Sequence, residues 1–121
     1  MNDGDSKTCP FDNQLPGEIK ARAYLDLNGN GQHDSGEPWL HGLSMQVYLN
    51  PTVPVANGLT GTNGTAWFPN LQAQIYTVCE VPPAGWHTTN PIAINPAYGK
   101  PCFTVNLNPG QEIPVLFGNS K

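Results

Sequence analysis

Charged residues are scarce in this sequence of 121 residues, and basic ones are the scarcest. Aspartate and glutamate number 9 against 5 lysines and arginines, which gives a formal net charge of -4 at pH 7. The basic residues form no cluster, so the chain lacks the positive surface that binds nucleic acid phosphates. We therefore expect no nucleic acid partner.

Long apolar segments and helical patterns are also missing. No stretch of 18 apolar residues is present and the N-terminus is polar, so we expect neither a membrane span nor a signal peptide, and we interpret the chain as a mature or excised piece. Gly and Pro contribute 13 residues each, which favours turns and short extended segments over amphipathic helices. The length suits a single domain.

Catalytic combinations are absent as well. The three histidines, His33, His41 and His87, have no nucleophile near them in sequence, and neither a Gly-x-Ser-x-Gly nor a His-Glu-x-x-His motif occurs. His33 is expected to point to solvent. We expect a protein that is not an enzyme and has no small-molecule substrate.

Cysteines are few, namely Cys9, Cys79 and Cys102. A structural zinc site needs four ligands, which typically arrive in close pairs, so these widely spaced cysteines do not predict one. Cys79 and Cys102 lie in strand-like segments, on the side away from the apolar residues, and an opposed cross-strand pair can meet disulfide geometry. We favour a Cys79–Cys102 disulfide; pairings through Cys9 and three reduced thiols are the alternatives.

Short segments in which apolar and polar residues alternate predict seven β-strands separated by clusters of Gly, Pro and Asn. They cover residues 17–25, 43–49, 53–60, 65–69, 74–80, 102–107 and 112–117. Residues 81–101 are interpreted as a stiff loop, and Asn63-Gly64 and Pro109-Gly110 as tight turns. The spacing is typical of a β-sandwich.

One acidic loop, from Asp26 to Glu37, carries the clearest chemical signal. It places oxygen-bearing side chains at positions 1, 3, 5, 9 and 12 and Gly31 at position 6, which is the spacing of a calcium-binding loop. The expected Ca²⁺ ligands are the side chains of Asp26, Asn28 and Asn30, the backbone carbonyl of Gln32, Asp34 directly or through water, and both carboxylate oxygens of Glu37.

The flanks of this loop are strand-like, and Pro38 follows it directly. We therefore expect a clamp between two strands rather than a calcium sensor that opens helices. The alternative is a solvated hairpin loop with ordinary surface charges.

The loop, together with residues 40–49 (LHGLSMQVYL), 60–71 (TGTNGTAWFPNL) and 75–80 (IYTVCE), resembles the SdrD B-like domain of serine-aspartate repeat adhesins. The resemblance covers about residues 17–119. It implies a seven-stranded, prealbumin-like β-sandwich of Greek-key type, related to Cna B-type (Ig-like) domains, that binds calcium and serves as a stalk or spacer. Residues 17–121 then form the domain, and residues 1–16 an N-terminal arm or linker.

The related Cna B-type domains contain a lysine that forms an isopeptide bond with an asparagine. By the resemblance, Tyr24 stands at the lysine position, while Glu80 and Asn119 keep the partner positions. We expect no such crosslink; Lys20, on the same strand face, is the remote alternative.

These inferences predict a calcium-stabilised, non-catalytic spacer module of a secreted or cell-surface, adhesin-type protein, whose partners are neighbouring domains or subunits. One alternative is a self-assembling subunit of an extracellular filament or sheath, in which the N-terminal arm and calcium lie at subunit contacts. Another is a carbohydrate- or protein-binding module. Its sugar-stacking aromatics would be Trp39, Trp67 and Trp86 with Tyr48 and Tyr98, although the resemblance places Trp67 and Trp86 as core or edge aromatics.

Overall fold

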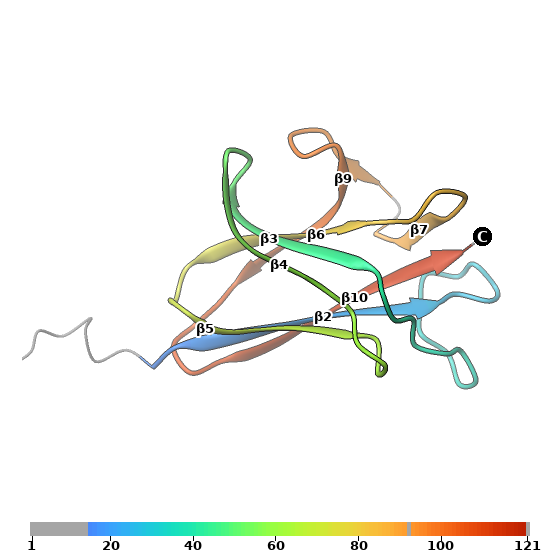
Figure 1. Cartoon of the computed structure of the whole chain (residues 1–121), viewed down its shortest axis with the longest axis horizontal. Coiled ribbons are helices and arrows are strands. Elements are labelled where there is room, and N and C mark those ends of the chain that lie inside the picture. The colour runs from blue at the N-terminus through green and yellow to red at the C-terminus, as the bar shows by residue number, and fades with distance from the viewer. Residues whose placement is uncertain (1–14, 92, 121) are drawn as a thin grey trace, which may run out of the picture.

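The protein is a sandwich of two β-sheets (Figure 1). The computed structural model describes residues 15–91 and 93–120, so Cys9 and most of the N-terminal arm lie outside the described residues. The described residues contain no helix, and hence none long and apolar enough to cross a membrane. The all-β prediction is confirmed.

The described residues form nine strands. They are β2 (Gly17–Leu25), β3 (Ser44–Asn50), β4 (Val53–Leu59), β5 (Thr65–Leu71), β6 (Ile75–Val81), β7 (His87–Asn90), β8 (Ile94–Asn95), β9 (Lys100–Asn106) and β10 (Glu112–Ser120). One sheet has the order β5-β2-β10-β7 and the other β4-β3-β6-β9-β8. The first described strand and the last lie side by side and run parallel.

The predicted strands correspond to β2 to β6, β9 and β10, and the count exceeds the prediction by two. Both additional strands, β7 and β8, lie in residues 81–101, which were predicted to be a loop. They are 4 and 2 residues long and sit at sheet edges. A strand this short shows too little alternation to be recognised among prolines and glycines.

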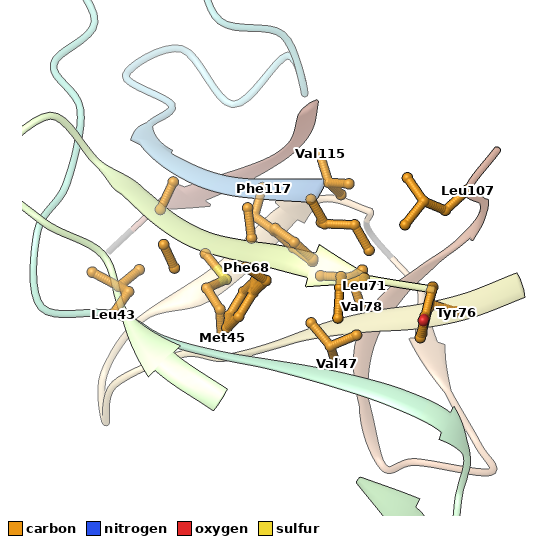
Figure 2. Close-up of a cluster of buried hydrophobic side chains, with 14 residues drawn as sticks. Leu43, Met45, Val47, Phe68, Leu71, Tyr76, Val78, Leu107, Val115 and Phe117 are labelled. Atoms are coloured by element: carbon orange, nitrogen blue, oxygen red, sulfur yellow. The ribbon is translucent and has the colours of Figure 1, made fainter. Parts of the chain in front are cut away.

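The core follows the alternation of the strands. Ile19, Ala21 and Ala23 of β2 are completely buried, as are Val78 and Phe117. Figure 2 shows the buried side chains of the two sheets packed against each other. Because successive side chains of a strand point to opposite faces, the residues between them in sequence lie on the outside of the sandwich.

The tight turn before β5 requires glycine. Gly64 has a φ of 75°, and a Cβ there would lie 2.6 Å from Trp39 Cβ and 2.9 Å from the carbonyl oxygen of Ala23. Ala23 in turn donates its N–H to the Gly64 carbonyl at 2.9 Å. The predicted Asn63-Gly64 turn is thus packed directly against the end of β2.

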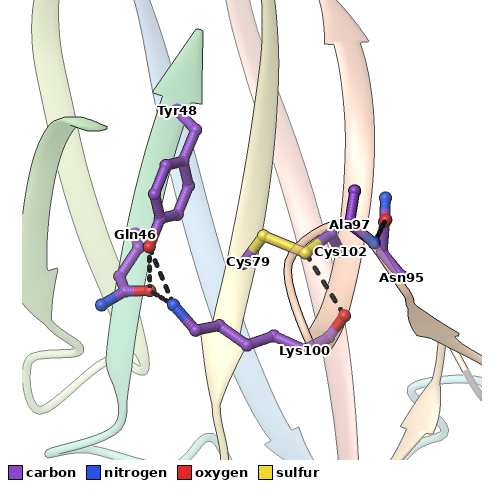
Figure 3. The surroundings of a disulfide bond; sticks show 7 residues. All are labelled: Gln46, Tyr48, Cys79, Asn95, Ala97, Lys100 and Cys102. Carbon is purple, nitrogen blue, oxygen red and sulfur yellow. Dashed lines mark hydrogen bonds between the residues drawn. A yellow bond between two sulfur atoms is a disulfide. The ribbon is translucent and has the colours of Figure 1, made fainter. Parts of the chain in front are cut away.

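A disulfide joins Cys79 of β6 to Cys102 of β9 on the outer face of the five-stranded sheet (Figure 3). The two residues are directly opposed in the strand register, and their Cα atoms are 4.1 Å apart. Lys100 lies beside the bond, where its ammonium group donates to Gln46 and Tyr48. This is the pairing favoured from the strand pattern.

Candidate metal-binding loop

The loop from Asp26 to Glu37 is closed at its neck by strand-like pairing. The Leu25 amide donates to the Pro38 carbonyl at 2.9 Å, and the Asp26 amide donates to the Asn119 carbonyl at 2.7 Å. Tyr24 and Trp39 form an isolated antiparallel bridge across the same neck. The loop therefore lies at one end of the sandwich, beside the end of β10 (Figure 1).

Asp26 is the central acceptor of the loop. Its side chain is only 1% exposed and accepts hydrogen bonds from the Gly31 amide at 2.7 Å, the Asn30 amide at 3.2 Å and the Thr89 hydroxyl at 2.6 Å. Burial alone would raise the pKa of Asp26, but the Thr89 hydroxyl and the loop amides outweigh it and hold that pKa below its usual value. Asp26 is therefore a carboxylate at neutral pH.

Glu37 closes the loop from the other side. It is 6% exposed, and its two carboxylate oxygens accept from the Leu27 amide at 2.8 Å and from the Asp34 amide at 2.9 Å. Among the described residues the only ion pair joins Lys20 to Glu112, so neither Asp26 nor Glu37 has a lysine or arginine partner there. Two buried acidic groups thus share the neck, and no lysine or arginine in the described part of the chain compensates their charge.

The remaining predicted ligands gather around Asp34. The side-chain amides of Asn28 and Asn30 both donate to one carboxylate oxygen of Asp34, at 3.0 and 2.8 Å. Their amide oxygens accept from the backbone of the loop: Asn28 from Asn30, and Asn30 from Gln32 at 2.9 Å. Gln32 is exposed and joins the loop through its backbone. All six predicted residues therefore belong to one hydrogen-bonded unit.

Gly31, at the sixth position of the loop, has a φ of 78°. A glycine adopts this left-handed conformation without steric cost, as the sharp turn of a calcium-binding loop requires.

We tested whether this donor set fits a divalent cation. No group of three or more His, Cys, Asp or Glu side chains in the described part of the chain is close enough to hold a metal ion. Asp26, Asp34 and Glu37 are therefore not gathered around one centre in this structure, but the predicted donors are carboxylate, amide and carbonyl oxygens, which a hard cation such as Ca²⁺ prefers. The donor chemistry fits, provided that ion ligation replaces the hydrogen bonds between the Asn amides and Asp34.

His33, inside the loop, and Thr89, outside it, make contacts that the sequence did not predict. His33 was expected to point to solvent, and it is exposed; in addition its Nε2 lies 2.8 Å from the Glu37 carbonyl oxygen, and its ring stacks on Trp39 with centroids 4.1 Å apart. Thr89 comes from β7, 63 residues after Asp26. No spacing rule connects residues so distant, and only the paired strands bring them together.

A second polar cluster lies between the sheets. Glu80 and Asn119 are both completely buried, and Asn119 Nδ2 donates to Glu80 at 2.9 Å while the Thr88 hydroxyl donates at 2.8 Å. Burial raises the pKa of Glu80 to about 7, although both hydrogen bonds act in the opposite direction. The Asn119 side-chain oxygen is buried without a hydrogen-bond partner.

The structure brings no lysine to this cluster among the described residues. Tyr24 packs outside the sandwich against His33 and Trp39, whereas its neighbour Ala23 faces the core. Lys20 lies on the outer face, bonded to Glu112. Lys20 is therefore on the wrong side of the sheet to react with Asn119.

Comparison of sequences gives limited overlap with known proteins. No protein-family model matches the chain. Colossin-C of Dictyostelium discoideum is 34% identical over 58 residues, which cover 47% of this chain and 6% of that protein. Colossin-A of the same organism is 30% identical over 67 residues, which cover 55% of this chain and 1% of that protein. The chain thus spans only a small fraction of the length of these relatives.

Comparison of structures covers nearly the whole chain. The TIE protein of Bacillus anthracis is similar with a TM-score of 0.62 and 23% identity, over 88% of this chain and 18% of that one. The major pilin SpaD of Corynebacterium diphtheriae has a TM-score of 0.63 and 16% identity, over 94% of this chain and 34% of that one. The shaft pilin SpaA of Lactobacillus rhamnosus GG has a TM-score of 0.59 and 16% identity, over 87% of this chain and 49% of that one. At these identities the likeness establishes the fold, a prealbumin-like β-sandwich.

Proposed function

We propose that this chain is a calcium-stabilised structural module of a secreted or cell-surface protein, of the SdrD B-like type, and that it catalyses no reaction. The observation that carries the proposal is the pair of buried acidic side chains, Asp26 and Glu37, at the neck of one loop without a cationic partner among the described residues. Buried charges normally have a partner, and a bound Ca²⁺ would supply one.

The ligands in this proposal are Asp26, Asn28, Asn30, the Gln32 carbonyl, Asp34 and Glu37. The loop amides and Thr89 already hold Asp26 in place. Because these bonds orient the first ligand before any ion binds, less conformational entropy is lost on binding. The bound ion would offset the mutual repulsion of the three carboxylates.

Such an ion would stiffen one end of the sandwich. The loop contacts β10 through the Asn119 carbonyl and β7 through the Thr89 hydroxyl, and its neck continues β2. The loop therefore contacts three neighbouring strands of one sheet. A module that is rigid at this end would hold a neighbouring domain at a defined angle, which is what a spacer requires.

Two findings support an extracellular setting. The Cys79–Cys102 disulfide persists in oxidising compartments such as the cell surface. Several solved structures with this fold are pilins by name, including a major pilin and a shaft pilin. The likeness to pilins also favours the second candidate function, a subunit of an extracellular filament. Light scattering with and without calcium distinguishes the two candidates, because a spacer module stays monomeric whereas a filament subunit forms larger assemblies.

The test is a calcium titration followed by thermal unfolding. Calcium at about 100 times its dissociation constant contributes about 2.7 kcal/mol, which for a domain of this size raises Tm by roughly 10 °C. Glu37→Gln should abolish the rise, and Glu112→Gln, which alters an exposed carboxylate bonded to Lys20, should leave it intact. The calcium-dependent rise is the readout, so a lower baseline in a variant does not matter. If calcium leaves the parent Tm unmoved, the calcium proposal is wrong.

A further inference from the structure

The outer face of the four-stranded sheet carries a shallow hollow, and none of the predicted calcium ligands lines it. Its volume is about 710 Å³, and side chains of β2, β5 and β10 line it, among them Trp67, Glu18, Lys20, Arg22, Thr65 and Glu112. These three strands lie side by side in the sheet (Figure 1). The volume is within the range of about 300–1,000 Å³ that is usual for small-ligand sites.

Trp67 is the main apolar element of this hollow. Its side chain is 60% exposed, although its neighbours in β5, Ala66 and Phe68, are buried in the core. The indole N–H donates to Glu18, which fixes the orientation of the ring. Trp67 therefore presents a held aromatic surface to solvent, with a polar edge already satisfied.

The polar side chains around Trp67 are held as well. Arg22 donates from Nε to the Thr65 hydroxyl at 3.0 Å, and its guanidinium lies 3.7 Å from the centre of the Trp39 ring. Lys20 is bonded to Glu112. Fixed groups lose little conformational entropy when a ligand binds.

The charges of the hollow balance. Glu18 and Glu112 are acidic, Lys20 and Arg22 are basic, and no excess of either sign remains in this set. A surface without net charge does not concentrate an anionic or cationic partner by long-range attraction. It offers instead many hydrogen-bond donors and acceptors around one apolar ring.

We propose that this hollow binds a neutral oligosaccharide. A β-linked pyranose ring has an apolar face of C–H groups, which stacks on an indole, and a rim of hydroxyl groups, which bond to carboxylates and guanidinium. Trp67 is the indole on which the apolar face would stack, and Glu18, Arg22 and Glu112 are the partners for the hydroxyl groups. Because the hollow is shallow and on a sheet face, it takes the middle of an extended β-1,4-linked chain. The proposal is independent of calcium binding.

Isothermal titration of the full 121-residue chain with cellohexaose and with chitohexaose tests this, with calcium present throughout. At least one hexasaccharide should bind the parent, and Trp67→Ala should weaken binding about ten-fold or more, while Trp67→Phe retains most of it. Ile75→Ala is the matched control, because Ile75 is similarly exposed, at 59%, on the other sheet. It should leave the affinity unchanged.

Either of two results would overturn the proposal: neither hexasaccharide binds the parent, or Trp67→Ala binds as well as the parent. If the sugars fail to bind and the parent self-associates in sedimentation through Trp67, this face is a protein contact instead.

Discussion

Lowering the pH from neutral should stabilise this protein, because of Glu80. The Glu80 carboxyl is completely buried, and its pKa rises from 4.5 to about 7. Below about pH 4.5 both the folded and the unfolded states hold the proton. Between about pH 4.5 and 7 the unfolded carboxyl ionises while the folded one does not, so stability falls as pH rises. Above about pH 7 both states are ionised and the loss is complete.

The size of the effect follows from the shift in pKa. A shift of one unit corresponds to about 1.4 kcal/mol, so the shift of Glu80 amounts to about 3 kcal/mol of unfolding free energy between pH 4.5 and 8. The protonated carboxyl also carries a hydrogen-bond donor, and the Asn119 side-chain oxygen of the same cluster is buried without a partner.

Urea denaturation at a series of pH values between about 4.5 and 8, in chelator, measures this. Glu80→Gln is the matched variant: a glutamine cannot ionise, yet it offers both a donor and an acceptor to Asn119. Since the two proteins differ only at residue 80, the difference between parent and variant isolates Glu80. The variant should be the more stable protein at pH 8 by up to about 3 kcal/mol. If the two proteins show the same pH profile, the reasoning about Glu80 is refuted.

Two further predictions concern the scaffold. Replacing both Cys79 and Cys102 by alanine, in a Cys9→Ser background that prevents other pairings, should lower the unfolding free energy by about 3 kcal/mol, because the disulfide closes a loop with a sequence separation of 23. An unchanged urea midpoint would contradict this. Gly64→Ala should lower the unfolding free energy by more than about 2 kcal/mol in the same assay, because the new Cβ would clash with Trp39 and Ala23. Gly99 has a similar φ but open space around it, so Gly99→Ala should cost only about 1 kcal/mol; equal losses in the two variants would show that backbone strain alone decides.

Most of the strands could be predicted because alternation is a local property. In β2 the apolar residues Ile19, Ala21 and Ala23 recur every second position, and the structure buries all three. The strands β7 and β8 could not be predicted, because they are too short to show a period and exist only by pairing with β10 and β9. Tyr24 interrupts the alternation of β2, and its outward position follows from the contacts with His33 and Trp39.

The candidate loop divides in the same way. Its twelve residues carry the full spacing of a calcium-binding loop, because the ligands of such a site are close together in sequence. Calcium binding itself stays a prediction. The brace from Thr89 to Asp26 could not be predicted, since the two residues meet only when β7 pairs with β10. The exposure of Trp67 likewise depends on which face of β5 is covered.

The sequence alone determined the all-β class, the candidate loop and its donor set, and the absence of catalytic motifs, because each depends on residues a few positions apart. The tertiary structure decided which faces are buried. Only the packing of two sheets places Glu80 beside Asn119 and buries both, leaves Asp26 and Glu37 without a cation among the described residues, and exposes Trp67 on the outer face. Burial and charge compensation depend on residues distant in sequence, and the fold brings those residues together.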